Sequence, residues 1–136
     1  MVSVVIDCSV FISAMLKDEF NPLSFGLVDK LVNNELKAVV PNIFFIEAAN
    51  AILMSFRRNR ITKTDLILYT NLLNNTEIES DYTFNAPEII YLSTNHDLTT
   101  YDAAYLELAL RRSCKIATLD KKLSQAAAQL NLLYTA

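Results

Sequence analysis

The stretch "VSVVIDCSVFISAMLK", residues 2–17, decides the fold class, because it passes directly from a strand pattern to a helical one. Residues 2–7 form a short β-branched run that ends in a polar residue, which is typical of a buried strand. The residues that follow have helical spacing, and Ser9 is expected to cap that helix. A buried strand that leads straight into a helix is the repeating unit of an α/β protein.

The rest of the chain repeats this alternation. Further strands are expected at residues 36–41, 76–80, 114–120 and 132–135. Further helices are expected at residues 21–35, 41–60, 62–75, 85–96, 99–113 and 121–131, with Pro22 in a first turn, Pro41 at a helix start and Thr62 as a cap. The pattern predicts one α/β domain, residues 1–136, with a mainly parallel sheet of about five strands sandwiched by helices.

Composition excludes several classes of protein. The 136 residues are 52% hydrophobic and 20% charged, which predicts an ordered domain with a real core. No apolar run reaches the roughly 18 residues of a membrane span, and no signal peptide is apparent, so we expect a soluble cytoplasmic protein without a membrane. A single glycine, Gly26, excludes both the Walker A loop and the G-x-G-x-x-G loop. A single histidine, His96, excludes a histidine-based zinc site.

The net charge and the two cysteines give further information about the class of protein. The formal net charge of −3 argues against nucleic-acid binding driven by a broad basic surface, but an acidic site that holds cations lowers the total by itself. Cys8 and Cys114 lie far apart in the sequence, and we expect both to be buried free thiols.

Four carboxylates occupy unusual positions. Asp7 and Asp120 come at the ends of predicted strands, where ligand sites form in open α/β sheets. Asp102 opens a predicted helix, and Glu47 is the only formal charge in the apolar helix between residues 41 and 56. The other acids with polar neighbours are expected to be solvated surface residues: Asp18, Glu19, Asp29, Glu35, Asp65, Glu77, Glu79 and Asp81.

Each of the four acids also has a structural explanation. Asp7 would cap the following helix, Asp102 would complete a capping pattern with Thr99, and Glu47 would pair with a distant basic residue. Four separate structural roles are a poorer explanation if all four acids lie at one edge of the sheet. Clustered carboxylates repel one another, and a bound hard cation such as Mg²⁺ or Mn²⁺ relieves this repulsion. A carboxylate pocket of this kind favours metal-assisted attack of water on a phosphate ester.

Four segments, in order, resemble the PIN domain family, and within it the VapC-type toxin ribonucleases. They are "VVIDCSVFIS" with its D-x-S motif, the proline-led "VPNIFFIEAANAI", "LTTYDAAYLELAL" with Y-D-A-x-Y, and "CKIATLDKKL" with T-x-D. The resemblance covers essentially the whole chain.

The resemblance implies a function and a site. Asp7, Glu47, Asp102 and Asp120 would form the catalytic, metal-binding site of a Mg²⁺- or Mn²⁺-dependent endoribonuclease. The polar side chains expected to orient these acids are Ser9, Asn50 and Thr118. The resemblance also implies a homodimer and inhibition by a small VapB-like antitoxin. The apolar helices at residues 22–32 and 65–73 would leave a groove for an amphipathic antitoxin helix.

Binding of RNA requires basic side chains near the acidic site, and the sequence offers few of them. Lys121 and Lys122 adjoin Asp120 and are expected to contact phosphate, whereas Arg111 and Arg112 either complement a helix end or meet RNA.

Two other interpretations of the function remain possible from the sequence. A PIN-like scaffold would bind RNA or protein without cutting it. A phosphoaspartate enzyme of the haloacid-dehalogenase type would need a second aspartate where this chain has Ser9.

Overall fold

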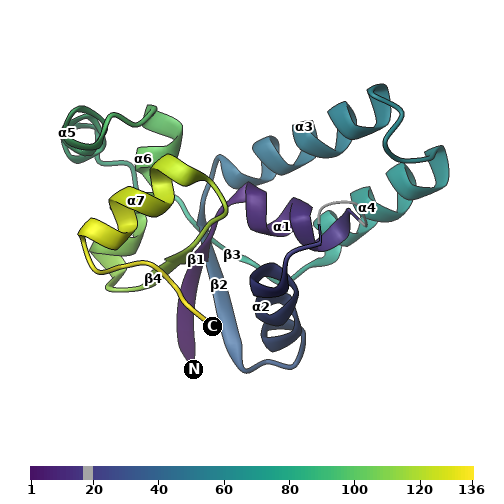
Figure 1. Cartoon of the computed structure of the whole chain (residues 1–136), viewed down its shortest axis with the longest axis horizontal. Helices are drawn as coiled ribbons and strands as arrows, with labels where there is room; N and C mark the ends of the chain where they lie inside the picture. The colour runs from purple at the N-terminus through teal and green to yellow at the C-terminus, as the bar shows by residue number, and fades with distance from the viewer. Residues whose placement is uncertain (17–19) are drawn as a thin grey trace.

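The computed structural model describes residues 1–16 and 20–136, and it confirms an α/β fold around a parallel sheet (Figure 1). The sheet has the order β3-β2-β1-β4, and all three pairings are parallel. The strands span β1 (Val2–Ile6), β2 (Leu36–Pro41), β3 (Glu79–Asp81) and β4 (Lys115–Ala117).

Helices cover both faces of this sheet. In Figure 1 one group lies to the right of the strands and consists of α1 (Cys8–Met15), α2 (Pro22–Val32), α3 (Phe44–Arg57) and α4 (Lys63–Asn75). The other group lies to the left and consists of α5 (Ala86–His96), α6 (Thr100–Arg112) and α7 (Lys121–Gln129). Because the strands are parallel, their carboxyl ends meet at one edge, at the top of the sheet in this view.

The strands are buried because helices pack on both sides of them. Val5, in the middle of β1, pairs with Val39 of β2 and Ile116 of β4, and all three side chains are fully buried. A near-continuous β-branched run is what such a two-sided environment selects. This is the reason the strand pattern was readable in the sequence.

Most helix starts follow the capping chemistry of the sequence. Thr62 and Asp65 form a complete capping box at α4, and Asn21 caps α2 with Pro22 in its first turn. One expectation was wrong: α1 is capped by Asp7, whose carboxylate accepts from the amide of Val10, and not by Ser9. The Ser9 hydroxyl is engaged with Asp7 instead.

The expected fifth strand at residues 132–135 is not formed. Leu133 makes a single parallel bridge with Ile116, flanked by two hydrogen bonds: Ile116 N–H to the Leu132 carbonyl at 2.7 Å, and Tyr134 N–H to the Ile116 carbonyl at 2.8 Å. The partner strand β4 is only three residues long, so the last segment runs beside it for one residue and then leaves.

Other boundaries differ by a few residues. Pro41 was expected to start a helix, but it is the last residue of β2, and α3 begins only at Phe44. Proline has no amide proton to donate to a neighbouring strand, which makes a strand end a suitable position for it. The first helix ends at Met15. The expectations for Lys17, Asp18 and Glu19 lie outside the described residues.

The rarity of glycine has a local explanation. In the described chain five residues adopt left-handed backbone angles, and all are polar residues at the ends of helices or turns: Asn34, Asn59, Asp97, Ser113 and Asn131. Asparagine and aspartate tolerate this conformation better than other residues with a side chain. Short polar side chains therefore end the helices where glycine is the common choice.

Two smaller expectations can be compared with the structure. None of the described helices combines the length and the apolar character that crossing a membrane requires. Both cysteines are free thiols, with Cys114 buried and Cys8 half-buried beside Asp7.

Candidate functional site

The carboxylate of Asp7 lies at the carboxyl edge of the sheet and is held from both sides. Asp7 directly follows β1, is only 6% exposed, and accepts a hydrogen bond from the Ser9 hydroxyl at 2.5 Å. Its second oxygen accepts from the hydroxyl of Thr118, which directly follows β4. The Ser9 hydroxyl in turn accepts a hydrogen bond from the backbone amide of Leu119, and the Thr118 hydroxyl accepts one from the amide of Asp120. This hydrogen-bond network connects the carboxyl ends of the neighbouring strands β1 and β4.

Two further acids lie at helix N-termini. Asp120 caps α7 by accepting from the amide of Leu123 at 2.8 Å. Asp102 is in the first turn of α6, where its own amide donates to the hydroxyl of Thr99, the N-cap. A helix N-terminus favours negative charge, so both carboxylates have a local reason to be there.

Glu47 reaches the same region from α3. It lies in the first turn of that helix and is half-buried. Its Oε1 atom accepts a hydrogen bond of 2.7 Å from the hydroxyl of Tyr105, a side chain on α6 that is 1% exposed. The sequence interpretation gave Tyr105 no role, although a buried tyrosine hydroxyl requires a partner.

The four acids influence one another electrostatically. Burial raises the pKa of Asp7, against the lowering effect of hydrogen bonds from Ser9, Thr118 and Val10, and the charge of Asp120 raises it further. Burial also raises the pKa of Asp102, with additional contributions from Asp120 and Asp7.

Glu47 follows the same pattern. Burial raises its pKa, the Tyr105 hydroxyl lowers it, and the charges of Asp102 and Asp7 raise it again. Asp7, Glu47 and Asp102 each lie close enough to another carboxylate for its charge to disfavour their ionisation, and no arginine or lysine is among the causes of these pKa shifts. A cation is the natural complement of such a group.

The donor set suits a hard divalent cation, but the side chains do not form a closed cage as they stand. Oxygen ligands without histidine or cysteine are what Mg²⁺ and Mn²⁺ select. Within residues 1–16 and 20–136, no three acidic, histidine or cysteine side chains lie close enough together to hold an ion.

The expected supporting residues divide into two groups. Ser9 and Thr118 contact Asp7 directly, as described above. Asn50 is exposed, and no hydrogen bond of its side chain is found in the described part of the chain. Lys121 is exposed at the start of α7, and Lys122 forms an exposed ion pair with Asp97 at 3.2 Å.

Asp81 was expected to be a solvated surface residue, and this expectation was wrong. It ends β3, is 9% exposed, and receives two hydrogen bonds of 3.0 and 3.1 Å from the guanidinium of Arg111. Arg112 donates a third, of 3.0 Å, and Arg111 also pairs with the buried Glu107. The two arginines therefore join the end of α6 to the edge strand, and these contacts occupy the guanidinium groups that were considered for RNA.

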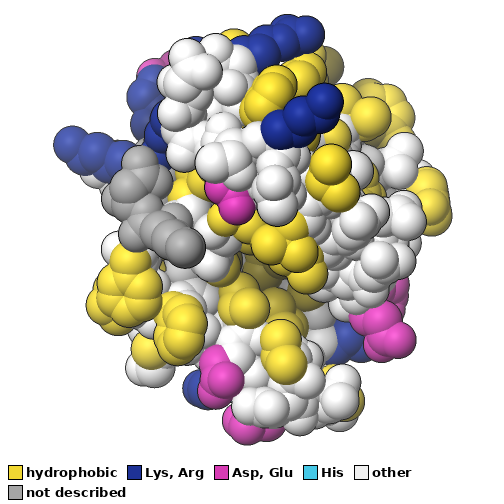
Figure 2. Space-filling view, turned by 90° about the vertical axis from the view of Figure 1, so that its right-hand side faces the viewer, with side chains coloured by type: hydrophobic (Ala, Val, Ile, Leu, Met, Phe, Trp, Pro, Cys, Tyr) yellow, Lys and Arg dark blue, Asp and Glu magenta, His cyan; other side chains and the backbone are white. Residues whose placement is uncertain are grey.

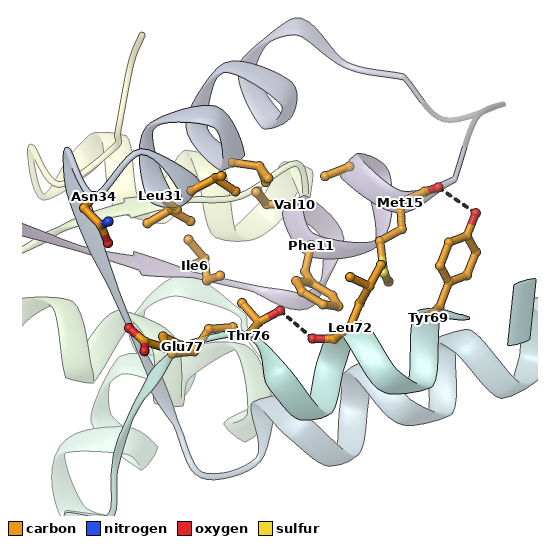
Figure 3. A pocket seen from close by; sticks show the side chains of 14 residues that line it. Ile6, Val10, Phe11, Met15, Leu31, Asn34, Tyr69, Leu72, Thr76 and Glu77 are labelled. Atoms are coloured by element: carbon orange, nitrogen blue, oxygen red, sulfur yellow. Dashed lines mark hydrogen bonds between the residues drawn. The ribbon is translucent and has the colours of Figure 1, made fainter. Parts of the chain in front are cut away.

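An apolar groove with a volume of about 670 Å³ lies between α1, α2 and α4. Figure 3 shows Val10, Phe11 and Met15 of α1 facing Leu72 of α4 across it, with Leu31 of α2 beside them. Figure 2, which views the molecule from the α3–α4 end of Figure 1, shows hydrophobic side chains gathered in and around a hollow on this side. The helices expected to have surplus apolar surface thus line one groove.

A second apolar surface adjoins the acids. A cleft of about 530 Å³ is bounded by the start of α3, the segment after β3, and α6. Large exposed side chains border it: Ile46 at 73%, Tyr82 at 75%, Phe84 at 76% and Tyr101 at 56%. Ile46 and Tyr101 directly precede Glu47 and Asp102 in the sequence.

Comparison with known proteins identifies the class. The PIN domain family model matches residues 4–129, so the chain belongs to the PIN domain family, whose members are generally nucleases. Curated protein sequences contain no significant match to this chain.

Solved structures with the same fold include three whose sequences are distant. PAE2754 from Pyrobaculum aerophilum superposes with a TM-score of 0.72 at 18% identity, over 92% of this chain and 79% of its own. VapC20 of Mycobacterium tuberculosis, a toxin that cleaves the sarcin-ricin loop, gives 0.62 at 13% identity over 90% and 94%. FitAcB from Neisseria gonorrhoeae gives 0.61 at 17% identity over 92% and 93%. At these identities the likeness concerns the fold alone.

Proposed function

We propose that this protein is a Mg²⁺- or Mn²⁺-dependent endoribonuclease, the toxin of a VapBC-type toxin-antitoxin pair. The observation that carries the proposal is the set of four carboxylates at one sheet edge, three of which have pKa values raised by burial and by the charge of other members of the set. Membership of the PIN family and the fold shared with the VapC20 toxin support the same assignment.

The residues of the site have distinct roles in this proposal. Asp7, Glu47, Asp102 and Asp120 would hold the cation, which when bound supplies Lewis-acid stabilisation and a more acidic water. Ser9 and Thr118 fix both oxygens of Asp7, so that its carboxylate keeps one orientation. The backbone amides at the N-terminus of α6 favour the charge of Asp102, which opposes the effect of burial and of the neighbouring carboxylates.

Positive charge for the substrate is assigned to the start of α7. Lys121 is exposed next to Asp120, and the partner of Lys122 among the described residues is Asp97, whose side chain is itself 94% exposed. We assign both lysines to phosphate contacts with RNA. Replacing both by alanine is expected to weaken RNA binding and to flatten its dependence on salt, and an unchanged salt slope would remove them from the site.

The first experiment measures the metal site directly. Calorimetry with Mn²⁺ compares the wild type with Asp7→Asn and Asp102→Asn, and Asp29→Asn on the exposed surface of α2 serves as the control. Binding that the first two changes abolish and the control keeps would support the proposal. Asp102→Asn should also retain most of its stability and lose RNA cleavage, so retained cleavage by a folded variant would refute the role of Asp102.

A non-cutting PIN scaffold is the competing candidate. The observation in its favour is that no three of the described acids are close enough to hold an ion. If a well-folded wild type binds no Mn²⁺ and cleaves no RNA in the presence of Mn²⁺, this alternative takes first place.

The groove between α1, α2 and α4 is proposed to receive the amphipathic helix of a small antitoxin. Its walls are apolar, and Glu77 and Asn34 lie at one end of it in Figure 3, so a helix with an apolar stripe and a basic residue would match it. Leu72→Arg should abolish co-purification of a small partner from the native host. Ile67→Arg, on a different face of α4 and outside the groove, is the matched control, and equal losses in both variants would contradict the assignment.

The aromatic surface beside the acids is proposed to bind a second copy of the chain. Homodimer interfaces are more apolar than the rest of a surface and are enriched in aromatic residues, and Phe84 is 76% exposed at this cleft. Light scattering after size exclusion should give a dimer for the wild type and a monomer for Phe84→Lys. Tyr91→Lys, an exposed change on α5 outside the cleft, should remain dimeric.

A further inference from the structure

Tyr105 contacts the acidic site although its side chain is almost completely buried. It is 1% exposed, is among the largest fully buried side chains of the described chain, and lies on α6 one turn after Asp102. Its hydroxyl donates to Glu47 Oε1 at 2.7 Å, across 58 positions of sequence and between two helices. This is the hydrogen bond that ties α6 to the carboxylate of α3.

The direction of the hydrogen bond is fixed. Burial, followed by the hydrogen bond and the charge of Glu47, raises the pKa of the Tyr105 hydroxyl far above its ordinary value. In the hydrogen bond itself the Tyr105 hydroxyl is the donor and Glu47 Oε1 is the acceptor. One oxygen of Glu47 is held by this bond, and Oε2 accepts no hydrogen bond from the described residues.

Glu47 needs such a contact more than the aspartates do. A glutamate side chain has three rotatable bonds, and this one is half-exposed, so packing alone does not select one rotamer. Asp7 is shorter and is fixed by two hydroxyls and an amide, and Asp120 is fixed by the amide of Leu123. Tyr105 supplies the corresponding hydrogen bond for the longest of the four acids.

We propose that Tyr105 is a positioning residue that holds the Glu47 carboxylate toward the divalent cation of the site. The inference rests on the proposed metal-dependent function. Residues that orient metal ligands in this way typically contribute 10- to 100-fold to metal affinity. Tyr105→Phe, which removes only the hydroxyl, is therefore expected to weaken Mn²⁺ binding by about 10-fold or more.

The test is a double-mutant cycle on Mn²⁺ affinity, measured by calorimetry on the full chain. The variants are Tyr105→Phe, Glu47→Gln and their combination. The matched control is Tyr91→Phe, whose ring is 58% exposed on α5, outside the aromatic cleft. The proposal expects Tyr105→Phe to weaken binding in the wild-type background and to add no further loss once Glu47 is Gln. A residue that only fills the core would give the same loss in both backgrounds.

The outcomes separate this inference from the function on which it rests. If the wild type binds Mn²⁺ and Glu47→Gln weakens binding, while Tyr105→Phe behaves like Tyr91→Phe, the positioning role is overturned and the metal site stands. If the wild type binds no Mn²⁺, both are overturned. Thermal unfolding without metal verifies that each variant is folded.

A second variant keeps the inference testable if folded Tyr105→Phe cannot be obtained. Glu47→Asp retains the charge but withdraws the carboxylate from the tyrosine hydroxyl by one methylene. The proposal expects this variant also to lose about 10-fold in Mn²⁺ affinity. Affinity equal to that of the wild type would show that the position of the carboxylate, and hence Tyr105, does not matter.

Discussion

Replacement of Asp81 by asparagine should destabilise the fold substantially, although this residue lies outside the acidic site. The Asp81 side chain is 7% exposed and accepts hydrogen bonds from Arg111, from Arg112 and from the amide of Thr83. Hydrogen bonds from Arg111 lower its pKa from 3.8 to about 2, against the opposing effect of burial. Asparagine keeps the shape of the side chain and removes the charge that both arginines face.

The magnitude follows from that lowered pKa. A carboxylate with a pKa of about 2 in the folded state and 3.8 in the unfolded chain contributes roughly 2 kcal/mol at neutral pH. The arginine side chains are 31% and 33% exposed, so solvent screening keeps the loss near this value and below that of a fully buried pair. For a domain of this size the melting temperature should fall by roughly 5 to 8 °C.

The pH dependence gives a sharper test than the size of the effect. Because the folded pKa is depressed, the stabilisation by Asp81 is complete above pH 3.8 and is lost as the pH falls toward about 2. Urea unfolding of the wild type and Asp81→Asn should therefore differ by roughly 2 kcal/mol at pH 7 and converge near pH 2. Asp29→Asn, on an exposed face of α2, should stay within about 0.5 kcal/mol of the wild type. A constant difference between wild type and Asp81→Asn across this pH range would refute the ion-pair explanation.

Three further predictions concern stability. Glu47→Gln should raise the melting temperature of the metal-free protein at pH 7: burial and the charges of Asp102 and Asp7 raise the Glu47 pKa, so its ionised form destabilises the fold above pH 4.5. Calorimetric scans should show the gain disappearing below pH 4.5, and a lower melting temperature at pH 7 would contradict it. Mn²⁺ at 100 times its dissociation constant should stabilise the wild type by about 2.7 kcal/mol, and a chelator should reverse this in the same scan. Ser113→Gly should raise the free energy of unfolding by up to about 1 kcal/mol, because Ser113 ends α6 with φ 54° and glycine adopts that conformation without strain. Urea unfolding measures this change, and a destabilised variant would show that the Ser113 side chain has a role not visible in its contacts.

The fold was predictable where local pattern and burial agree. Strands β1, β2 and β4 are short β-branched or apolar runs because helices cover both faces, and β1 and β4 are each followed by a helix with an aspartate cap. The failures were of two kinds. The segment at residues 132–135 has strand composition, but its pairing depends on the length of β4, which the segment itself does not reveal. Pro41 satisfies the pattern of a helix start as well as that of a strand end, and only the tertiary structure distinguishes them.

Long-range contacts explain what the sequence missed around the site. Asp81 has polar neighbours in the chain, and its partner Arg111 is 30 positions away, so no local signal marks it as buried. Tyr105 did carry a signal: it is a tyrosine within the long buried part of α6, and its hydroxyl had to find a partner there. The positions of Asp7 and Asp120 at strand ends were readable because parallel strands bring those ends to one edge.

Position at a strand end does not by itself distinguish a site acid from a structural one. Asp7 follows β1 and Asp81 ends β3, so both lie at the carboxyl edge of the same sheet. The pKa of Asp81 is lowered because Arg111 donates hydrogen bonds to it, whereas the pKa of Asp7 is raised because burial outweighs its hydrogen bonds and the charge of Asp120 raises it further. Among the residues that the structure describes, an arginine pairs with Asp81, and no arginine or lysine contributes to the pKa shift of Asp7. An acid at this edge that no arginine or lysine neutralises costs stability in the free protein, and a divalent cation relieves that cost, which is why we assign Asp7, and not Asp81, to the metal site.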